Sequence, residues 1–267
     1  MYKQASDPWI PWYNGHQVAS LSRLRRGGPS ASPARRRYRL ITNSYRVNSS
    51  ASEDRLESLI RQRLEPGADK KRIDERIWDL FGEDWSVMFT DLSGFSRRVA
   101  EFGIIHFLQT IYEAERLLLP IIEEHDGILL KTEGDSFLVI FRNPAKALHC
   151  SIAMQRCLGD YDRGRPDEEK VLLCVGLGHG KVLRIGDADV YGAEVNAASK
   201  LGEDTAKAWE ILVTGAMRDA IDAGTGRAGD SGAASTAAAE GPEGVGFEEL
   251  GEAPPGAASA FKVKYRL

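Results

Sequence analysis

Two aspartates in this sequence stand where a folded chain can place a carboxylate beside a turn. Asp91 follows an apolar run in "FTDLSGFSRRV", and Asp135 follows a glycine in "KTEGDSF". A carboxylate at a strand end, beside the first amides of a helix, suits a metal-bound polyphosphate, because the carboxylate binds the cation and the backbone N–H groups bind phosphates. Two alternatives stay open: Asp91 only caps a helix, and Asp135 lies in an ordinary charged hairpin turn.

The stretch 133–135 predicts the tip of a β-hairpin that brings Asp135 to the end of the strand before Asp91. Two aspartates that meet there would hold two Mg²⁺ ions, the arrangement that clamps an in-line phosphoryl displacement. Lys131 precedes Asp135 by four residues, so an unbroken strand would put both side chains on one face. The turn at Gly134 interrupts that alternation, and the two side chains can therefore point to different places.

A third group of polar residues lies in "DADVYGAEVNAASK", which contains Asp189, Asn196 and Lys200. If residues 195–201 are helical, Asn196 and Lys200 lie on one face. An amide and a cation one turn apart can bind a ribose and a developing phosphate charge. The same spacing is also typical of a solvated helix surface.

The elements that must position these residues alternate along the chain. Strands are expected at 85–91, 127–132, 136–141 and 171–178, and helices at 104–124 and 144–158. The order β-α-β-β-α-β is the split βαβ arrangement, an α+β, ferredoxin-like βαββαβ core with an antiparallel sheet and helices on one face. A helix at 192–201, a strand at 210–214 and a closing hairpin from 247–250 and 261–267 complete it.

Composition divides the chain into three parts. Residues 1–50 are expected to be a disordered basic tail, residues 51–82 a helical N-terminal segment, and residues 83–267 the main domain with a low-complexity insert at 222–246. Residues 1–52 carry nine basic side chains against Asp7, a charge of +8. Because the net charge of the whole chain is −4, the remaining residues carry −12. An acidic folded part argues against a nucleic-acid partner.

No apolar stretch is long enough to span a bilayer. The three cysteines have no paired C-x-x-C spacing, which argues against a zinc site or a disulfide framework and favours a reducing compartment. We expect a cytoplasmic protein. The alternative is an organelle, because the Arg- and Ser-rich, acid-poor start also fits a transit peptide.

The three polar stretches, in this order, resemble the class III adenylyl and guanylyl cyclases over roughly residues 85–214. The gap of 44 residues between Asp91 and Asp135 fits that family's separation of its two metal aspartates. The resemblance implies the class III nucleotide cyclase fold, two Mg²⁺ or Mn²⁺ ions per active site, and a homodimer whose two sites form between subunits.

The resemblance also implies a role for each matching position. Asp91 and Asp135 would be the metal ligands, while Asn196 would orient the ribose and Lys200 would stabilise the transition state as the catalytic pair. The substrate-binding positions would be Lys131 and Asp189, which read the purine edge, with the helix-opening turn Gly94, Phe95 and Ser96.

The implied activity is that of an adenylate cyclase, a phosphorus–oxygen lyase that converts ATP to 3′,5′-cyclic AMP and pyrophosphate. A lysine donor and an aspartate acceptor match N1 and the 6-amino group of adenine. Guanine presents the opposite pattern at these positions and would leave both groups unpaired. ATP is therefore favoured over GTP, and a guanylyl cyclase ranks lower.

Two departures keep a second hypothesis open, a weak or inactive cyclase-homology domain that binds nucleotide and regulates a partner. Lys200 stands where the family usually has arginine, so reduced but nonzero turnover is expected. The loop "GEAPPGAASA" lacks the family's usual lysine, for which Lys262 or Lys264 are the available substitutes. A diguanylate cyclase ranks lowest, because Ser136 follows Asp135 where that family needs an acid.

Overall fold

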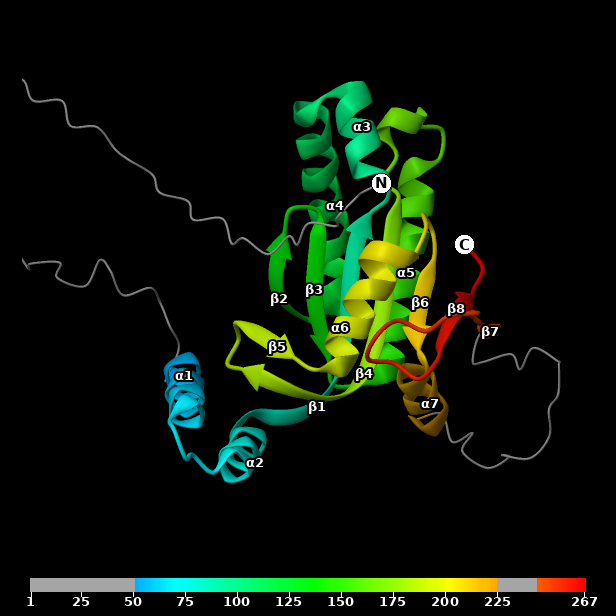
Figure 1. Ribbon diagram of the computed structural model, residues 1–267. Helices are drawn as coiled ribbons and strands as arrows, with labels where there is room; N and C mark the ends of the chain where they lie inside the picture. Colours follow the sequence, from blue (N-terminus) through cyan, green and yellow to red (C-terminus); the bar gives the residue numbers. More distant parts are fainter. Residues whose placement is uncertain (1–50, 225–243) are drawn as a thin grey trace, which may run out of the picture. The chain divides into compact units, whose positions relative to one another are not determined.

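One mixed sheet runs through the described part of the chain. The structure, a computed structural model, describes residues 51–224 and 244–267 (Figure 1). The expectations for residues 1–50, and for all but the ends of the insert at 222–246, lie outside the described residues. In chain order the elements are α1 (Ala51–Leu64), α2 (Lys70–Phe81), β1 (Gly82–Leu92), α3 (Phe95–Phe102), α4 (Ile104–Glu124), β2 (Ile128–Glu133), β3 (Ser136–Phe141), α5 (Pro144–Asp162), the 3₁₀ helix η1 (Asp167–Glu169), β4 (Leu173–Ile185), β5 (Asp189–Tyr191), α6 (Ala193–Ser199), the π-helix η2 (Lys200–Thr205), β6 (Ile211–Thr214), α7 (Gly215–Gly224), β7 (Gly246–Glu249) and β8 (Ala260–Lys264).

The strand order confirms the predicted βαββαβ core. Within the described residues the sheet runs β2-β3-β1-β4-β6-β8-β7, and β5 pairs with β4 outside this path. The long pair β1–β4 forms its centre, in register from Gly82 opposite Leu183 to Leu92 opposite Leu173. All pairs are antiparallel except β4–β6, which is parallel because the chain returns through β5 and α6 before β6 begins.

Side chains of β1 alternate between two cores, as a strand that is covered on both faces requires. Met88 and Leu92 join the larger core, in which Phe107 and Leu118 of α4 and Leu158 of α5 are buried. Trp85 and Val87 point to the opposite face, into a smaller core with Val195 of α6. Figure 1 shows α6 in front of the sheet and α4 behind it.

The two core helices α4 and α5 share one face of the sheet, as expected, whereas α6 covers the other. This helix has only seven residues, and its Val195, Ala197 and Ala198 are buried against the face opposite α4 and α5. Gly176 of β4 makes the close approach possible, since a Cβ there would lie 2.1 Å from the carbonyl oxygen of Ala198. α6 packs through short apolar side chains against a strand glycine. It has no long amphipathic pattern of the kind from which we predicted the other helices.

The N-terminal helices α1 and α2 pack on the end of the sheet. Leu59 of α1 and Ile77 and Phe81 of α2 are buried with Ile185 of β4. Asp69 caps α2, and Gly82 ends it. No helix in residues 51–224 or 244–267 combines the length and the apolar character needed to cross a bilayer. The three cysteines, at 150, 157 and 174, are free thiols.

Candidate active site

The end of β1 and the β2–β3 hairpin bring Asp91 and Asp135 together. The β1–β3 register places Phe89 opposite Leu138, so Asp91 reaches the first residue of β3, and the Ser136 hydroxyl donates to Asp91 Oδ1 at 3.5 Å. Gly134 has a φ of 62°, the left-handed conformation that the tight turn before Asp135 requires. The alternation of β1 puts Asp91 on the same face as Phe89, the face that α6 covers.

The electrostatics of this pair favour a cation. Burial raises the pKa of Asp91 to about 7, and the charges of Asp135 and Glu203 act in the same direction. Burial also raises the pKa of Asp135. The Leu92 N–H opposes both shifts but does not cancel them. In the described part of the chain, both carboxyls lack a positive partner and hold their protons more tightly than usual, and a divalent cation would compensate their negative charge.

The donor set fits Mg²⁺ or Mn²⁺ but does not enclose an ion. Asp135 Oδ2 is buried, and it has no hydrogen-bond partner among the described residues. Carboxylate oxygens are the ligands these hard cations prefer, and Mg²⁺ usually takes one or two carboxylates plus substrate phosphates. No group of three or more His, Cys, Asp or Glu in the described residues gathers closely enough to hold an ion. The remaining ligands would therefore come from a nucleotide and water.

A β-bulge at Leu130 sets the direction of Lys131. Pairing between β2 and β3 runs from Leu129 opposite Val139 directly to Lys131 opposite Leu138, so Leu130 is the extra residue. Leu138 points to the smaller core on the α6 face, and Lys131 therefore points there too. Without the bulge, Lys131 would pair with Phe137 and point into the larger core. The even spacing of Lys131 and Asp135 is thus not what sets the orientation of either side chain.

Lys131 and Asp189 form an ion pair across a small pocket. Lys131 Nζ lies 3.0 Å from Asp189 Oδ2, and the Val190 N–H fixes the other oxygen of Asp189 at 2.9 Å. Phe89 and Val195 are among the apolar side chains that line this pocket of about 90 Å³, which we call the Lys131 pocket. The hollows of 720–840 Å³ found along α2 and beside Arg98 are lined by other residues.

A second carboxylate near Lys131 was not expected from the sequence. Glu133 Oε1 lies 3.2 Å from Lys131 Nζ, and Glu133 also lines the Lys131 pocket. Burial disfavours the charged ammonium, but its bonds to Asp189 and Glu133 outweigh this effect and raise the pKa of Lys131. The spacing of two residues within one strand was the available signal, because such residues share a face.

Asn196 and Lys200 lie one turn apart, as predicted, but each has a partner outside the Lys131 pocket. Asn196 Nδ2 donates to the Pro255 carbonyl at 3.2 Å, and Lys200 Nζ lies 2.6 Å from Asp204 Oδ2. Both side chains are exposed. The helix changes at Lys200 from α to π, a form that often marks functional sites.

The two lysines that we considered as substitutes for the missing loop lysine are also paired. Lys262 Nζ lies 2.6 Å from Glu210, and Lys264 Nζ lies 2.5 Å from Glu248. Glu210 lies just before β6 and Glu248 lies in β7, in the half of the sheet away from β2. Within the described residues, neither lysine bonds to the aspartate pair or lines the Lys131 pocket.

The turn Gly94–Ser96 opens α3 directly after Asp91. Gly94 is left-handed, with a φ of 85°, and α3 begins at Phe95. The side chains of residues 95–97 lie outside the described residues. The Ser93 N–H donates to the Leu172 carbonyl at 2.7 Å, which ties the turn to the segment before β4.

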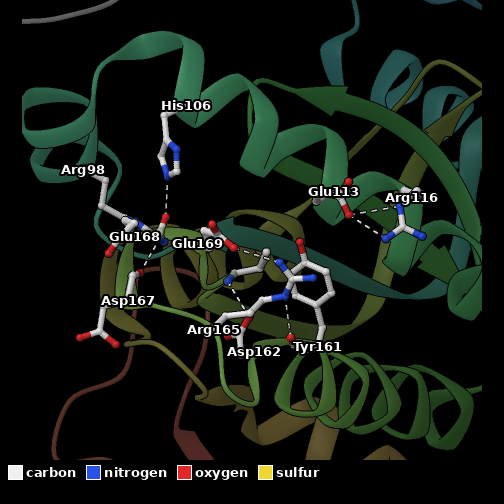
Figure 2. Close-up of polar contacts among 11 residues, drawn as sticks. Arg98, His106, Glu113, Arg116, Tyr161, Asp162, Arg165, Asp167, Glu168 and Glu169 are labelled. Carbon is white, nitrogen blue, oxygen red and sulfur yellow. Dashed lines mark hydrogen bonds and ion pairs between the residues drawn. The ribbon is translucent and has the colours of Figure 1, made fainter.

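A buried arginine holds α3 to the same segment (Figure 2). Arg98 is only 6% exposed and donates to the carbonyls of Asp167, Glu168 and Lys170 at 2.6–2.9 Å. His106 Nε2 of α4 also lies 2.6 Å from the Glu168 carbonyl. These contacts fix the first turns of α3 and α4, and with them the turn after Asp91. Sequence reasoning missed Arg98, because one arginine in "FSRRV" does not differ by type from a surface residue.

The family of this chain follows from its sequence match. The sequence model described as the adenylate and guanylate cyclase catalytic domain matches residues 82–232, more than half of the chain. The chain therefore belongs to the adenylate and guanylate cyclase catalytic domain family. The sheet and helices described above are those of class III cyclase structures.

Two curated relatives share parts of the sequence. Over 135 residues, 51% of this chain, it is 31% identical to the serine/threonine-protein kinase pkn2 of Myxococcus xanthus. Over 116 residues, 43% of this chain, it is 26% identical to the putative adenylate cyclase 3 of Rhizobium meliloti (strain 1021). The matches cover 16% and 20% of those proteins, so the chain spans a fifth or less of their length.

Two solved structures show the same fold. The adenylate/guanylate cyclase/hydrolase from Silicibacter pomeroyi superposes with a TM-score of 0.53 at 21% identity, covering 68% of this chain and 96% of that one. The adenylyl cyclase CyaB from P. aeruginosa gives a TM-score of 0.53 at 18% identity, covering 70% and 96%.

Proposed function

We propose that this domain is an adenylyl cyclase, which converts ATP to 3′,5′-cyclic AMP and pyrophosphate. The observation that carries the proposal is the Lys131–Asp189 pair, 3.0 Å apart in the Lys131 pocket. Its lysine offers a donor for N1 of adenine, and its aspartate offers an acceptor for the 6-amino group. Guanine carries a donor at N1 and an acceptor at O6, so it would leave both protein groups mismatched.

Asp91 and Asp135 would hold two Mg²⁺ or Mn²⁺ ions, in keeping with their raised pKa values and the orphaned Asp135 Oδ2. The ions, when bound, would neutralise phosphate charge and acidify the ribose 3′-hydroxyl. The position of Asp91 at a strand end, just before the α3 amides, suits binding of the triphosphate at the same place.

The reaction joins the ribose 3′-oxygen to the α-phosphorus and breaks the bond from that phosphorus to the bridging oxygen of pyrophosphate. Asn196 would hold the ribose so that the 3′-hydroxyl lies in line with the leaving group. Lys200 would bind the charge that develops on the phosphate, once its ammonium moves from Asp204 to the substrate. The 3′-hydroxyl proton passes to water or a phosphate oxygen.

We further propose that two copies of the chain build each site. The Lys131 pocket, at about 90 Å³, is smaller than the roughly 300–1,000 Å³ of ordinary small-molecule sites, so another wall is needed. Lys131 would serve one site and Asp135 of the same hairpin the other. A two-fold dimer then holds two equivalent sites.

A catalytically weak regulatory domain is the second candidate. The observation that favours it is the partnered state of the cations: Lys200 is bonded to Asp204, and both Lys262 and Lys264 are bonded to glutamates. Lysine at 200 also lacks the planar donor fork of arginine. Such a domain would bind nucleotide and dimerise with little turnover.

One assay separates the two candidates and tests base preference. Purified protein is incubated with Mn²⁺ and either ATP or GTP, and cyclic nucleotides are quantified over a range of protein concentrations. An adenylyl cyclase gives cyclic AMP at a rate that rises more steeply than linearly with protein concentration below the dimer dissociation constant. Absence of cyclic AMP above background at high protein concentration, with nucleotide still bound, identifies the regulatory domain. Cyclic GMP as the main product contradicts the assigned base preference.

A further inference from the structure

Lys131 is held by two carboxylates, although recognition of adenine needs only one. Asp189 Oδ2 lies 3.0 Å and Glu133 Oε1 lies 3.2 Å from the same ammonium nitrogen. An ammonium group has three N–H donors. Among the described residues no other acceptor is bonded to it, so one N–H remains available to a ligand.

The charges in this part of the Lys131 pocket do not balance. Asp189 and Glu133 together carry two negative charges against the single positive charge of Lys131. The excess negative charge attracts the hydrogens of an amino group on the purine edge. It repels a carbonyl oxygen at the same position. Glu133 is therefore placed to affect adenine and guanine in opposite directions.

We propose that Glu133 is a specificity-determining residue of the Lys131 pocket. Its carboxylate orients the Lys131 ammonium and adds the negative charge that favours a purine with an amino group beside a ring acceptor over one with a carbonyl oxygen. This inference rests on the proposed function, since it concerns the base that the same pocket reads.

The size of the effect follows from exposure. The Glu133 side chain is 72% exposed and that of Lys131 is 36% exposed, so solvent screens their interaction strongly. We expect a change of about two- to fivefold in nucleotide preference, as for an exposed ion pair, rather than a reversal of preference.

The decisive variant is Glu133→Gln, which keeps the shape, removes the charge and adds an N–H₂ group that a guanine carbonyl can bond. Glu133→Asp keeps the charge. The matched control is Glu248→Gln, which breaks the Glu248–Lys264 pair of similar exposure on β7, at the opposite end of the sheet from β2. All variants are made in the full chain and checked for unchanged thermal unfolding.

Preference is measured in two ways: as the ratio of kcat/KM for ATP to that for GTP, and as the ratio of dissociation constants for their α,β-methylene analogues. Glu133→Gln is expected to lower both ratios two- to fivefold, with most of the change in KM, while Glu133→Asp and Glu248→Gln leave them unchanged. Ratios within 1.5-fold of the wild type overturn the inference. Equal losses for both nucleotides also overturn it, because they indicate a structural role. A wild type that binds neither analogue overturns the proposed function itself, a result distinct from an unchanged ratio.

Discussion

Asp91 is a carboxylate in a place that penalises its charge. It is half-buried, with Asp135 and Glu203 close enough to repel it, and together these effects raise its pKa to about 7. The folded chain therefore binds more protons than the unfolded chain between about pH 4 and pH 7. In the absence of a divalent cation, stability should fall as pH rises through that window. The ionised carboxylates thus lower the stability of the metal-free protein, and a bound cation would offset this cost.

Asp91→Asn should stabilise the metal-free protein and abolish its cyclase activity. Above pH 7 the amide removes a repelled charge, and its N–H₂ can donate to the orphaned Asp135 Oδ2. After allowance for solvent screening the gain is about 1–2 kcal/mol, or about 2–6 °C in Tm. The measurement is thermal unfolding with a chelator at pH 8 and at pH 5.

At pH 5 the wild-type carboxyl is protonated, so the advantage of the variant should shrink. Adding Mn²⁺ at pH 8 should stabilise the wild type more than Asp91→Asn. A variant that melts below the wild type at pH 8 without cation, or that gains as much from Mn²⁺, would contradict the assignment of Asp91 as a cation ligand.

At the scale of elements, the spacing of apolar residues predicted the long helix and the regular strand correctly. The helix at 104–124 and the strand at 136–141 were predicted with the bounds that the structure has, because their apolar residues repeat with the period of the element. The expected strand at 171–178 extends instead as β4 to Ile185, since its far end is half polar. β5 has only three residues, too few for a period to show.

The site was predictable to the extent that single residue types carry chemistry. The meeting of Asp91 with Asp135 follows from the hairpin and the strand end, and the sequence placed both. Glu133 and Arg98 were missed because their importance depends on what surrounds them. The bulge at Leu130 has no signal in the sequence. Positions 129 and 130 are both leucine, so the residue types do not show which of them is the extra residue.

Gly176→Ala should displace the helix that carries Asn196 and Lys200. The added methyl carbon would lie 2.1 Å from the Ala198 carbonyl oxygen, and backbone cannot yield as a side-chain tip does. We expect a loss of about 1–3 kcal/mol in unfolding free energy and a fall in kcat larger than the rise in KM. Denaturant unfolding and steady-state kinetics measure the two effects.

Gly224→Ala is the matched control, because a Cβ there meets nothing within 4 Å and its stability should barely change. Equal behaviour of the two variants would show that α6 does not depend on contact with Gly176.

At the scale of the whole molecule, the proposed dimer divides the site residues into two sets. In each site, Asp91 and Asp135 would come from one copy, while Lys131, Asp189, Asn196 and Lys200 would come from the other. Asp91→Ala and Asn196→Ala homodimers should each be nearly inactive. A heterodimer of the two variants has one site with both defects and one site with neither, so mixing the proteins should restore activity.

The recovered activity should approach a quarter of the wild-type rate for equimolar mixing, since half of the dimers are mixed and each has one intact site. Differently tagged chains, co-purified and assayed for cyclic AMP, provide the measurement. Mixed dimers that form but stay inactive would argue against sites shared between subunits.

The extra residue at Leu130 has a consequence for how such a domain diversifies. Removal of that one codon would restore strict alternation in β2 without turning the lysine, because Lys131 would still pair with Leu138 on the α6 face. A change of length before the lysine would therefore be absorbed at the irregular point of the strand. Among related chains, the number of residues between Gly127 and the lysine should vary more freely than the number between the lysine and Asp135, which fixes the pairing with Leu138.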